Sequence, residues 1–214
     1  MFLNFFQRIS AIIFYEIISI IGGKMKKLST KDLTILGLLS AITILFGLTP
    51  LGYIPFGVIR VTTLHIPTII GAIVCGPLIG GLVGLVFGLF SLFTNLTAPS
   101  SILYFMFINP LVSVLPRILI GVITGFAFRG LNSKFKEKFF VPFIVGGLGA
   151  IVNTVFVLGM GYILYAPKIA KAFDSASAGK VLLGVAASNL PLEILATSVI
   201  VGFIVPPLKK SLIK

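Results

Sequence analysis

The chain has little charge. Only 10% of its 214 residues are charged, whereas 57% are hydrophobic and the mean hydropathy is +1.17. A soluble domain needs about a quarter of its residues as Asp, Glu, Lys and Arg to cover its surface. The composition therefore predicts an all-α membrane protein, and the length allows about six helices of roughly 20 residues each.

Chemically reactive residues are also scarce. The chain has one cysteine, Cys75, one histidine, five acids and no tryptophan. A single cysteine excludes an internal disulfide, and there is no Cys/His cluster with metal-ligand spacing. The motifs of serine hydrolases, zinc proteases and nucleotide-binding loops are absent from the sequence. We therefore expect no enzymatic activity, no cofactor, and no hydrolysis of ATP by the chain itself.

Six hydrophobic segments are present, at residues 32–48, 64–75, 78–94, 105–128, 141–165 and 181–205. The second is short and contains Pro67, so neighbouring helices must shield it from lipid. With the N-terminus inside, the cytoplasmic stretches hold 12 Lys and Arg residues and the outer loops hold four. This asymmetry predicts that both termini are cytoplasmic. It also assigns the net charge of +12 to contacts with membrane lipid headgroups rather than to nucleic acid.

Residues 1–24 form an atypical segment. Residues 2–21 are apolar but contain Arg8 and Glu16, and they lack the cleavage site of a signal peptide. The run Gly22-Gly23-Lys24-Met25 can be encoded by a ribosome-binding site followed by a start codon. We therefore expect translation to start at Met25 rather than Met1, with residues 25–214 as a single domain. The alternative is an amphipathic helix at the membrane interface.

Two opposite charges lie near the middle of hydrophobic segments. Arg117 interrupts residues 105–128, and Glu193 interrupts residues 181–205. A charge at the centre of a membrane helix costs roughly 2.5–3.5 kcal/mol, so it persists only with a partner or a function. A guanidinium has five donor hydrogens, and a carboxylate can take two of them. Arg117 paired with Glu193 would keep donors for a solute, so a structural latch and the floor of a binding cavity are compatible interpretations.

Further polar residues extend from this pair toward the outer surface. Asn109, Ser113 and Arg117 follow at four-residue steps, which places them on one face of a single predicted helix. Asn189, Glu193 and Thr197 do the same on the last helix, and Asn153 lies near the centre of the fifth. Lipid would reject such side chains, so they should face one another. Either a purely structural polar network or a solute cavity explains the pattern, and the rise toward the outside favours a cavity.

The outer loops add candidate contacts. The loop at residues 49–63 contains Arg60, and His65 begins the next segment, while the loop after residue 94 ends at Tyr104. Both loops are candidates for a lid. Structural alternatives remain for His65, as a hydrogen-bonded interfacial histidine, and for Arg60, as a headgroup anchor. The outer loops carry a net charge of +3, which favours an anionic solute.

Small residues recur at four-residue spacing, which lets helix backbones approach closely. Gly80, Gly84 and Gly88 lie on the third segment, and Gly121 and Gly125 lie on the fourth. Internal packing is the default interpretation. For the first segment, where Gly37 and Ala41 have this spacing, a docking face for another membrane protein is a competing interpretation.

Four stretches resemble the substrate-binding S components of energy-coupling-factor (ECF) transporters: residues 55–67, 76–88, 109–117 and 189–193. The resemblance covers about residue 25 to the C-terminus. It implies a six-helix subunit of the bacterial cytoplasmic membrane that captures a vitamin or related micronutrient from outside. It also implies an energising module as partner, formed by a transmembrane coupling protein and two ABC-type ATPases, that docks on small residues of the first helix. Gly37, Ser40 and Ala41 match that face.

The predicted substrate contacts lie where the resemblance and the polar pattern agree: Arg60, His65, Asn109, Arg117, Asn153 and Asn189, with Tyr104 as a wall or lid and Glu193 orienting Arg117. Among substrates we favour pantothenate, because the chain resembles the subgroup of S components proposed for it; a carboxylate with hydroxyls also suits an entrance lined by Arg and Asn. Riboflavin, folate, pyridoxine-type compounds and queuosine precursors share the scaffold and remain alternatives. A non-transport scaffold or assembly subunit is the alternative of a different class.

Overall fold

The computed structural model describes residues 28–56, 59–99, 101–135 and 138–212, and residues 1–24 therefore lie outside the described chain. Helices dominate it: α2 (Thr30–Leu48), α3 (Ile66–Cys75), α4 (Pro77–Thr97), α5 (Tyr104–Phe107), α6 (Pro110–Ser113), α7 (Leu115–Phe135), α8 (Val141–Ala172) and α9 (Ala178–Leu212). After α2 come a short 3₁₀ turn, η1 (Pro50–Gly52), and two strands, β1 (Tyr53–Phe56) and β2 (Ile59–Thr62), which pair antiparallel.

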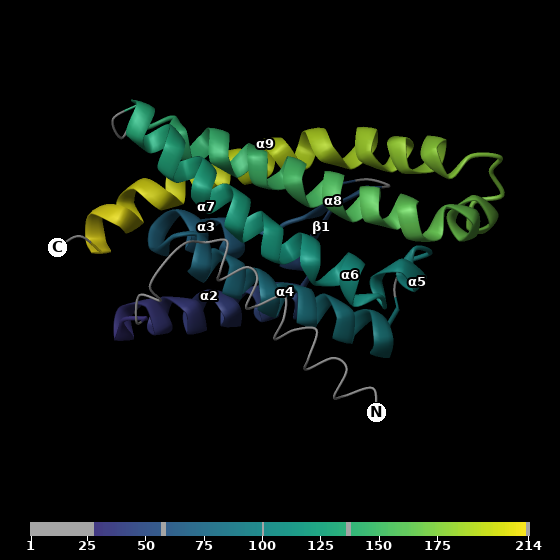
Figure 1. The fold of residues 1–214 in the computed structure, drawn as a ribbon, viewed down its shortest axis with the longest axis horizontal. Coiled ribbons are helices and arrows are strands. Elements are labelled where there is room, and N and C mark those ends of the chain that lie inside the picture. The colour runs from purple at the N-terminus through teal and green to yellow at the C-terminus, as the bar shows by residue number, and fades with distance from the viewer. Residues whose placement is uncertain (1–27, 57–58, 100, 136–137, 213–214) are drawn as a thin grey trace.

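Five stretches of helix in the described residues are long and apolar enough to cross a membrane: Thr30–Leu48, Pro77–Thr97, Pro110–Phe135, Val141–Ala172 and Ala178–Ser211. Figure 1 shows α2 beginning and α9 ending at the same end of the molecule, on the left. The short helices α5 and α6 and the connection between α8 and α9 lie at the opposite end. A mainly helical membrane protein is thus confirmed.

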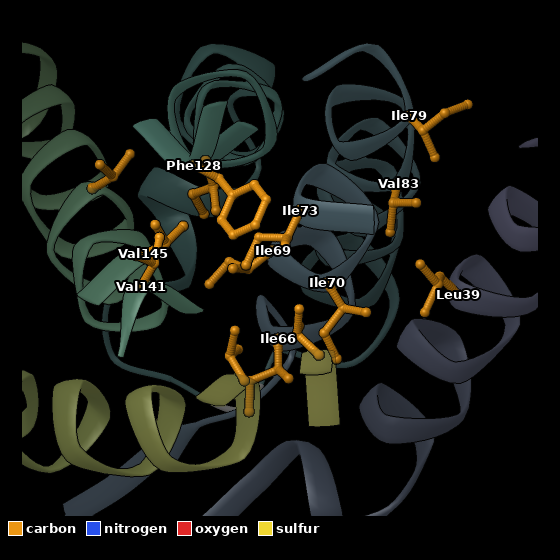
Figure 2. Close-up of a cluster of buried hydrophobic side chains, with 14 residues drawn as sticks. Leu39, Ile66, Ile69, Ile70, Ile73, Ile79, Val83, Phe128, Val141 and Val145 are labelled. Atoms are coloured by element: carbon orange, nitrogen blue, oxygen red, sulfur yellow. The ribbon is translucent and has the colours of Figure 1, made fainter. Parts of the chain in front are cut away.

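The second predicted segment, residues 64–75, forms α3, which has only ten residues and is about 15 Å long at 1.5 Å per residue. It is half the thickness of a bilayer's hydrocarbon core, roughly 30 Å. All its residues from Ile66 to Ile73 are buried. Figure 2 shows its isoleucines at the centre of the main apolar cluster, between α4 on one side and α7 and α8 on the other. Protein rather than lipid therefore surrounds this short helix, as its sequence required.

One predicted helix is wrong in its extent, and one predicted loop contains a hairpin. The segment at 105–128 is not one helix, because the chain forms α5 and α6 before α7 begins at Leu115. Asn109 caps α6 by accepting a hydrogen bond from the Leu111 amide, and Pro110 follows at the first helical position, where its missing N–H costs nothing. The loop at 49–63 contains the β1–β2 hairpin, in which Tyr53 pairs with Thr62 and Phe56 with Ile59.

Helices α4 and α7 approach closely through their glycines. A Cβ atom on Gly84 would lie 2.1 Å from the backbone oxygen of Arg117, and one on Gly121 would lie 2.1 Å from the carbonyl carbon of Gly80. Real Cβ atoms do not approach other atoms so closely, so these positions must be glycine. The internal-packing interpretation of these glycines is confirmed. Gly37 on α2 differs, because a Cβ there would meet nothing within 4 Å.

Two apolar clusters fill the interior. The larger surrounds α3 and includes Ile120 of α7, Val152 of α8 and Val201 of α9. The smaller joins α5 and α6 to the outer parts of α8 and α9, and includes Val112, Val157 and Leu182. Between these two clusters, α7, α8 and α9 each carry buried polar residues. The fold therefore places a polar layer between two apolar ones.

Candidate functional site

The buried polar residues between the two clusters define what we call the polar layer: His65, Arg117, Asn153, Glu193 and Thr197. Their exposed fractions are 0%, 6%, 8%, 5% and 1%. His65 bonds to Thr197, which lies one helical turn after Glu193 on α9, so the histidine and the carboxylate come from neighbouring parts of the structure. Neither central charge faces lipid. Both charges are therefore buried within the protein, and the pairing of Arg117 with Glu193 stays a prediction.

Glu193 is held by two threonines. Its Oε1 accepts a hydrogen bond of 3.1 Å from the backbone amide of Thr62 on β2, and its Oε2 accepts one of 3.4 Å from the Thr154 hydroxyl on α8. The carboxylate thus ties the end of the β1–β2 hairpin to α8 and α9. Thr62 acts through its backbone amide, which nearly every residue has, so its contact could not be predicted from the sequence. Thr154 was not singled out, because a threonine in an apolar segment is common.

Arg117 is held by α6 and by aromatic rings. Its Nη1 donates a 2.8 Å hydrogen bond to the carbonyl oxygen of Val112. Its guanidinium carbon lies 5.2 Å from the ring centroid of Phe87 on α4 and 5.6 Å from that of Phe107 on α5. Cations over aromatic faces are attracted by the ring quadrupole, by about 2 kcal/mol when desolvated. The two phenylalanines, which the sequence did not single out, therefore stabilise a buried charge.

His65 connects α3 to α9. It precedes the first residue of α3, and its Nε2 lies 2.9 Å from the Thr197 hydroxyl. Its other ring nitrogen, Nδ1, is buried without a hydrogen-bond partner in the described structure. The same is true of the Thr68 hydroxyl and of the side-chain oxygens of Asn153 and Asn189. Buried polar atoms are normally satisfied, so each such atom requires an explanation.

Asn153 lies on the face of α8 that meets α3 and α7. A Cβ on Gly149 would touch Ile69 of α3 and Thr124 of α7. Asn153 follows Gly149 by one helical turn, so it shares this face. Asn189, one turn before Glu193 on α9, donates its amide to the Val185 carbonyl at 3.0 Å. Each asparagine thus has a buried side-chain oxygen without a hydrogen-bond partner in the described chain.

The remaining predicted contacts are placed differently. Both polar atoms of the Asn109 side-chain amide bond to the protein. Its oxygen accepts from the Leu111 amide at the start of α6, and its nitrogen donates to the Tyr165 hydroxyl at 3.0 Å. Tyr104 starts α5, is 43% exposed and packs edge-on against Phe105. The backbone of Arg60 lies in β2 opposite Pro55, and the prediction for its side chain falls outside the described residues. Asn109 is therefore a structural residue in this conformation.

The predicted docking face is open. Gly37 and Ala41 are exposed on α2, and Ser40 is half-buried. Only Leu39 and Thr43 of this helix are buried. Chemically, the site offers hydrogen-bonding groups and charge. Within the described residues, no group of three His, Cys, Asp or Glu side chains lies together as metal ligands would.

Comparison with known proteins identifies the family. The family model described as "ECF transporter, substrate-specific component" matches residues 31–206. The chain belongs to this family. The buried polar layer of this S component thus lies inside a membrane subunit for solute capture, and its exposed α2 lies where a partner can reach it.

Two curated relatives are similar to this S component. The pantothenate transporter PanT of Leuconostoc mesenteroides subsp. mesenteroides is 38% identical over 141 residues, which are 63% of this chain and 69% of the relative. The pantothenic acid transporter PanT of Lactococcus lactis subsp. cremoris is 29% identical over 205 residues, which are 87% of this chain and 98% of the relative. The expected resemblance to S components is confirmed.

Proposed function

We propose that this S component captures pantothenate on the outer side of the membrane and delivers it to an importer. The observation that carries the proposal is the set of unused buried polar atoms on His65, Asn153 and Asn189, close to the Arg117–Glu193 pair. Two relatives named as pantothenate transporters favour this solute over the other vitamins.

The chemistry of pantothenate suits these groups. The molecule has a carboxylate, an amide and two hydroxyls, so its binding site needs both donors and acceptors. The Asn153 and Asn189 oxygens are acceptors for hydroxyl or amide hydrogens, and Arg117 supplies positive charge. Because a site built to hydrogen-bond a solute rejects analogues without those groups, the unused atoms provide selectivity.

The proposal includes an orientation of the helices across the membrane. Six helices, with α3 as a short one enclosed by protein, bring both ends of the chain to the cytoplasm of a bacterial cell. The hairpin and the α5–α6 region then lie toward the outside. Lysines and arginines concentrate at the cytoplasmic side in this arrangement, as the positive-inside rule requires.

Transport needs a partner. We propose that the energising module, a transmembrane coupling protein with two ABC-type ATPases, docks on α2 around Gly37, Ser40 and Ala41. Gly37 and Ala41 are exposed, and small residues allow close helix contact within a membrane. This S component then contributes binding and no chemical step.

Native mass spectrometry of gently purified protein tests the proposal. Pantothenate added in excess should give one bound molecule per chain, and Arg117→Ala should remove it. The mass distinguishes pantothenate from riboflavin, folate, pyridoxine-type compounds and queuosine precursors. A chain that retains only lipid after every vitamin is added is not a carrier. If Arg117→Ala lowers stability alone and leaves binding intact, the polar layer is a scaffold.

A further inference from the structure

The start of α3 holds two polar side-chain atoms without a hydrogen-bond partner in the described chain, one on His65 and one on Thr68. His65 and Thr68 are three residues apart, so they share one face of the helix. Both are 0% exposed. His65 Nδ1 and Thr68 Oγ1 are buried without hydrogen-bond partners in the described chain. Neither the close packing around α3 nor its connection to α9 accounts for these two atoms.

The tautomer of His65 follows from Thr197. Other buried threonines, such as Thr43 and Thr124, donate their hydroxyls to the carbonyl four residues earlier. Within the described residues, the Thr197 hydroxyl instead forms a hydrogen bond with His65 Nε2. A buried hydroxyl without an acceptor is costly, so the Thr197 hydroxyl donates to Nε2. The proton of a neutral imidazole then lies on Nδ1, which makes this unused atom a donor.

The backbone adds a donor at the same place. The first amides of a helix have no acceptor within it. In α3, the Ile66 amide donates to the Thr63 carbonyl, Pro67 has no amide hydrogen, and the Ile69 amide donates to the His65 carbonyl. The Thr68 amide therefore remains as the first-turn donor. The positive end of the helix dipole also lies here.

We propose that this turn is the anion subsite of the protein, where His65 Nδ1–H, the Thr68 hydroxyl and the Thr68 amide bind the carboxylate of the solute. Arg117 interacts electrostatically with His65, so its positive charge is close to the same point. Because α3 is about half a membrane thick, its N-terminus lies within the membrane rather than at its surface. The inference rests on the proposed function and assigns one end of the solute within it.

This assignment also orients the opposite, hydroxyl-bearing end of the solute. With the carboxylate at α3, the hydroxyls of pantothenate reach the Asn153 and Asn189 oxygens on α8 and α9, which are acceptors. Thr197 is a positioning residue, because it acts on the solute only through the His65 tautomer.

The test compares two solutes on matched variants of the full chain. Pantothenate has the carboxylate, whereas panthenol carries a hydroxymethyl group in its place. Titration calorimetry should show that Thr68→Val weakens pantothenate binding by about tenfold or more, the effect of one hydrogen bond to a charged group. Panthenol affinity should change less than about threefold, since the alcohol has no charge to lose. Thr68→Ser should restore pantothenate binding.

Thr124→Val is the control for removal of a buried threonine hydroxyl, since Thr124 is also 0% exposed but its hydroxyl donates to the Ile120 carbonyl. It should leave both affinities unchanged. His65→Asn keeps an amide donor near the position of Nδ1 and should retain more pantothenate affinity than His65→Gln. Thr197→Val should weaken the binding of pantothenate more than that of panthenol, and Thr197→Ser should restore pantothenate binding.

The outcomes separate the two hypotheses. Suppose that wild-type protein binds pantothenate. If the Thr68→Val protein has the same pantothenate affinity, or loses affinity for pantothenate and panthenol equally, the proposed subsite is wrong while the proposed function stands. If wild-type protein binds neither solute, the proposed function is wrong and the carboxylate assignment fails with it. Melting temperatures of all variants check folding, and Thr68→Val should melt no lower than wild type, because the lost hydroxyl satisfies no protein group.

Discussion

At the scale of single residues, both buried charges contact neutral neighbours. Glu193 accepts from Thr62 and Thr154, and Arg117 donates to a carbonyl and lies over two phenylalanine rings. Each charge therefore keeps a fixed position through these contacts. Such fixed groups can bind a solute without the cost of ordering flexible side chains at the moment of binding.

Substitution by alanine should affect ligand affinity at Asn153 and protein stability at Asn109. Asn153→Ala should lower pantothenate affinity by about tenfold, the effect of one lost hydrogen bond, with little change in melting temperature. Asn109→Ala should instead cost stability, about 1–2 kcal/mol, because Asn109 caps α6 and holds Tyr165. Calorimetry and thermal unfolding measure the two effects. The same response from both variants would contradict these assignments.

At the scale of elements, hydrophobic length predicted most helices well. The predicted segments at 141–165 and 181–205 lie within α8 and α9, and the glycine spacing predicted the close packing of α4 and α7. The break between α5, α6 and α7 was missed because the apolar run from residue 105 to 128 continues through it. Asn109 followed by Pro110 signals the start of α6, as a cap and a first-turn proline, and Pro116 lies in the first turn of α7.

Only some residues of the candidate site could be predicted from the sequence. Polar residues within apolar segments are visible in the sequence, so Arg117, Asn153 and Glu193 were found. The hairpin that brings the Thr62 amide to Glu193 has no strong turn signal such as Asn-Gly. The unused hydroxyl of Thr68 was also invisible, because a threonine within a helix normally bonds to its own backbone.

The packing of α4 against α7 positions Arg117. Gly84→Ala should push the two helices apart, because the new methyl group would meet the backbone of Arg117 at 2.1 Å. Overpacking of this kind costs typically about 1–3 kcal/mol, which outweighs the helix-propensity gain of roughly 1 kcal/mol. Thermal unfolding in detergent should show a lower melting temperature and weaker pantothenate binding.

Gly159 on α8 provides the matched control, since a Cβ there would meet nothing within 4 Å. Gly159→Ala should melt at the same temperature as wild type or higher. A Gly84→Ala protein as stable as the Gly159→Ala protein would mean that α4 and α7 are not held this closely.

At the scale of the whole molecule, the proposed solute site and the proposed docking face lie on different parts of the structure. The polar layer is enclosed, while α2 leaves most of its length uncovered, including Gly37 and Ala41. Solute binding and partner docking should therefore be separable by mutation, because no buried residue of the polar layer belongs to α2.

Ala41→Leu tests this separation. The larger side chain should obstruct close approach of a partner helix and lower uptake by at least about tenfold, equivalent to ~1.4 kcal/mol of docking energy. Pantothenate binding to the purified chain should not change. Uptake is measured in cells that express the energising module, with Gly159→Leu as a control at another open position. Equal loss of uptake in both variants would exclude a specific role for α2.

The orientation in the membrane is tested by cysteine labelling. In a Cys75→Ser background, Ala176→Cys in the α8–α9 connection should react with an impermeant maleimide added to intact cells. Lys134→Cys, near the end of α7, should react only after the cells are opened, because positively charged connections remain in the cytoplasm. The reverse pattern would invert the proposed topology.

The central claim is that the polar layer of this S component binds pantothenate, and titration calorimetry with the purified full chain tests it most directly. We predict saturable binding of one pantothenate per chain, lost in Arg117→Ala protein that remains folded. No binding of pantothenate by folded wild-type protein, under conditions in which it binds another vitamin, would contradict the claim.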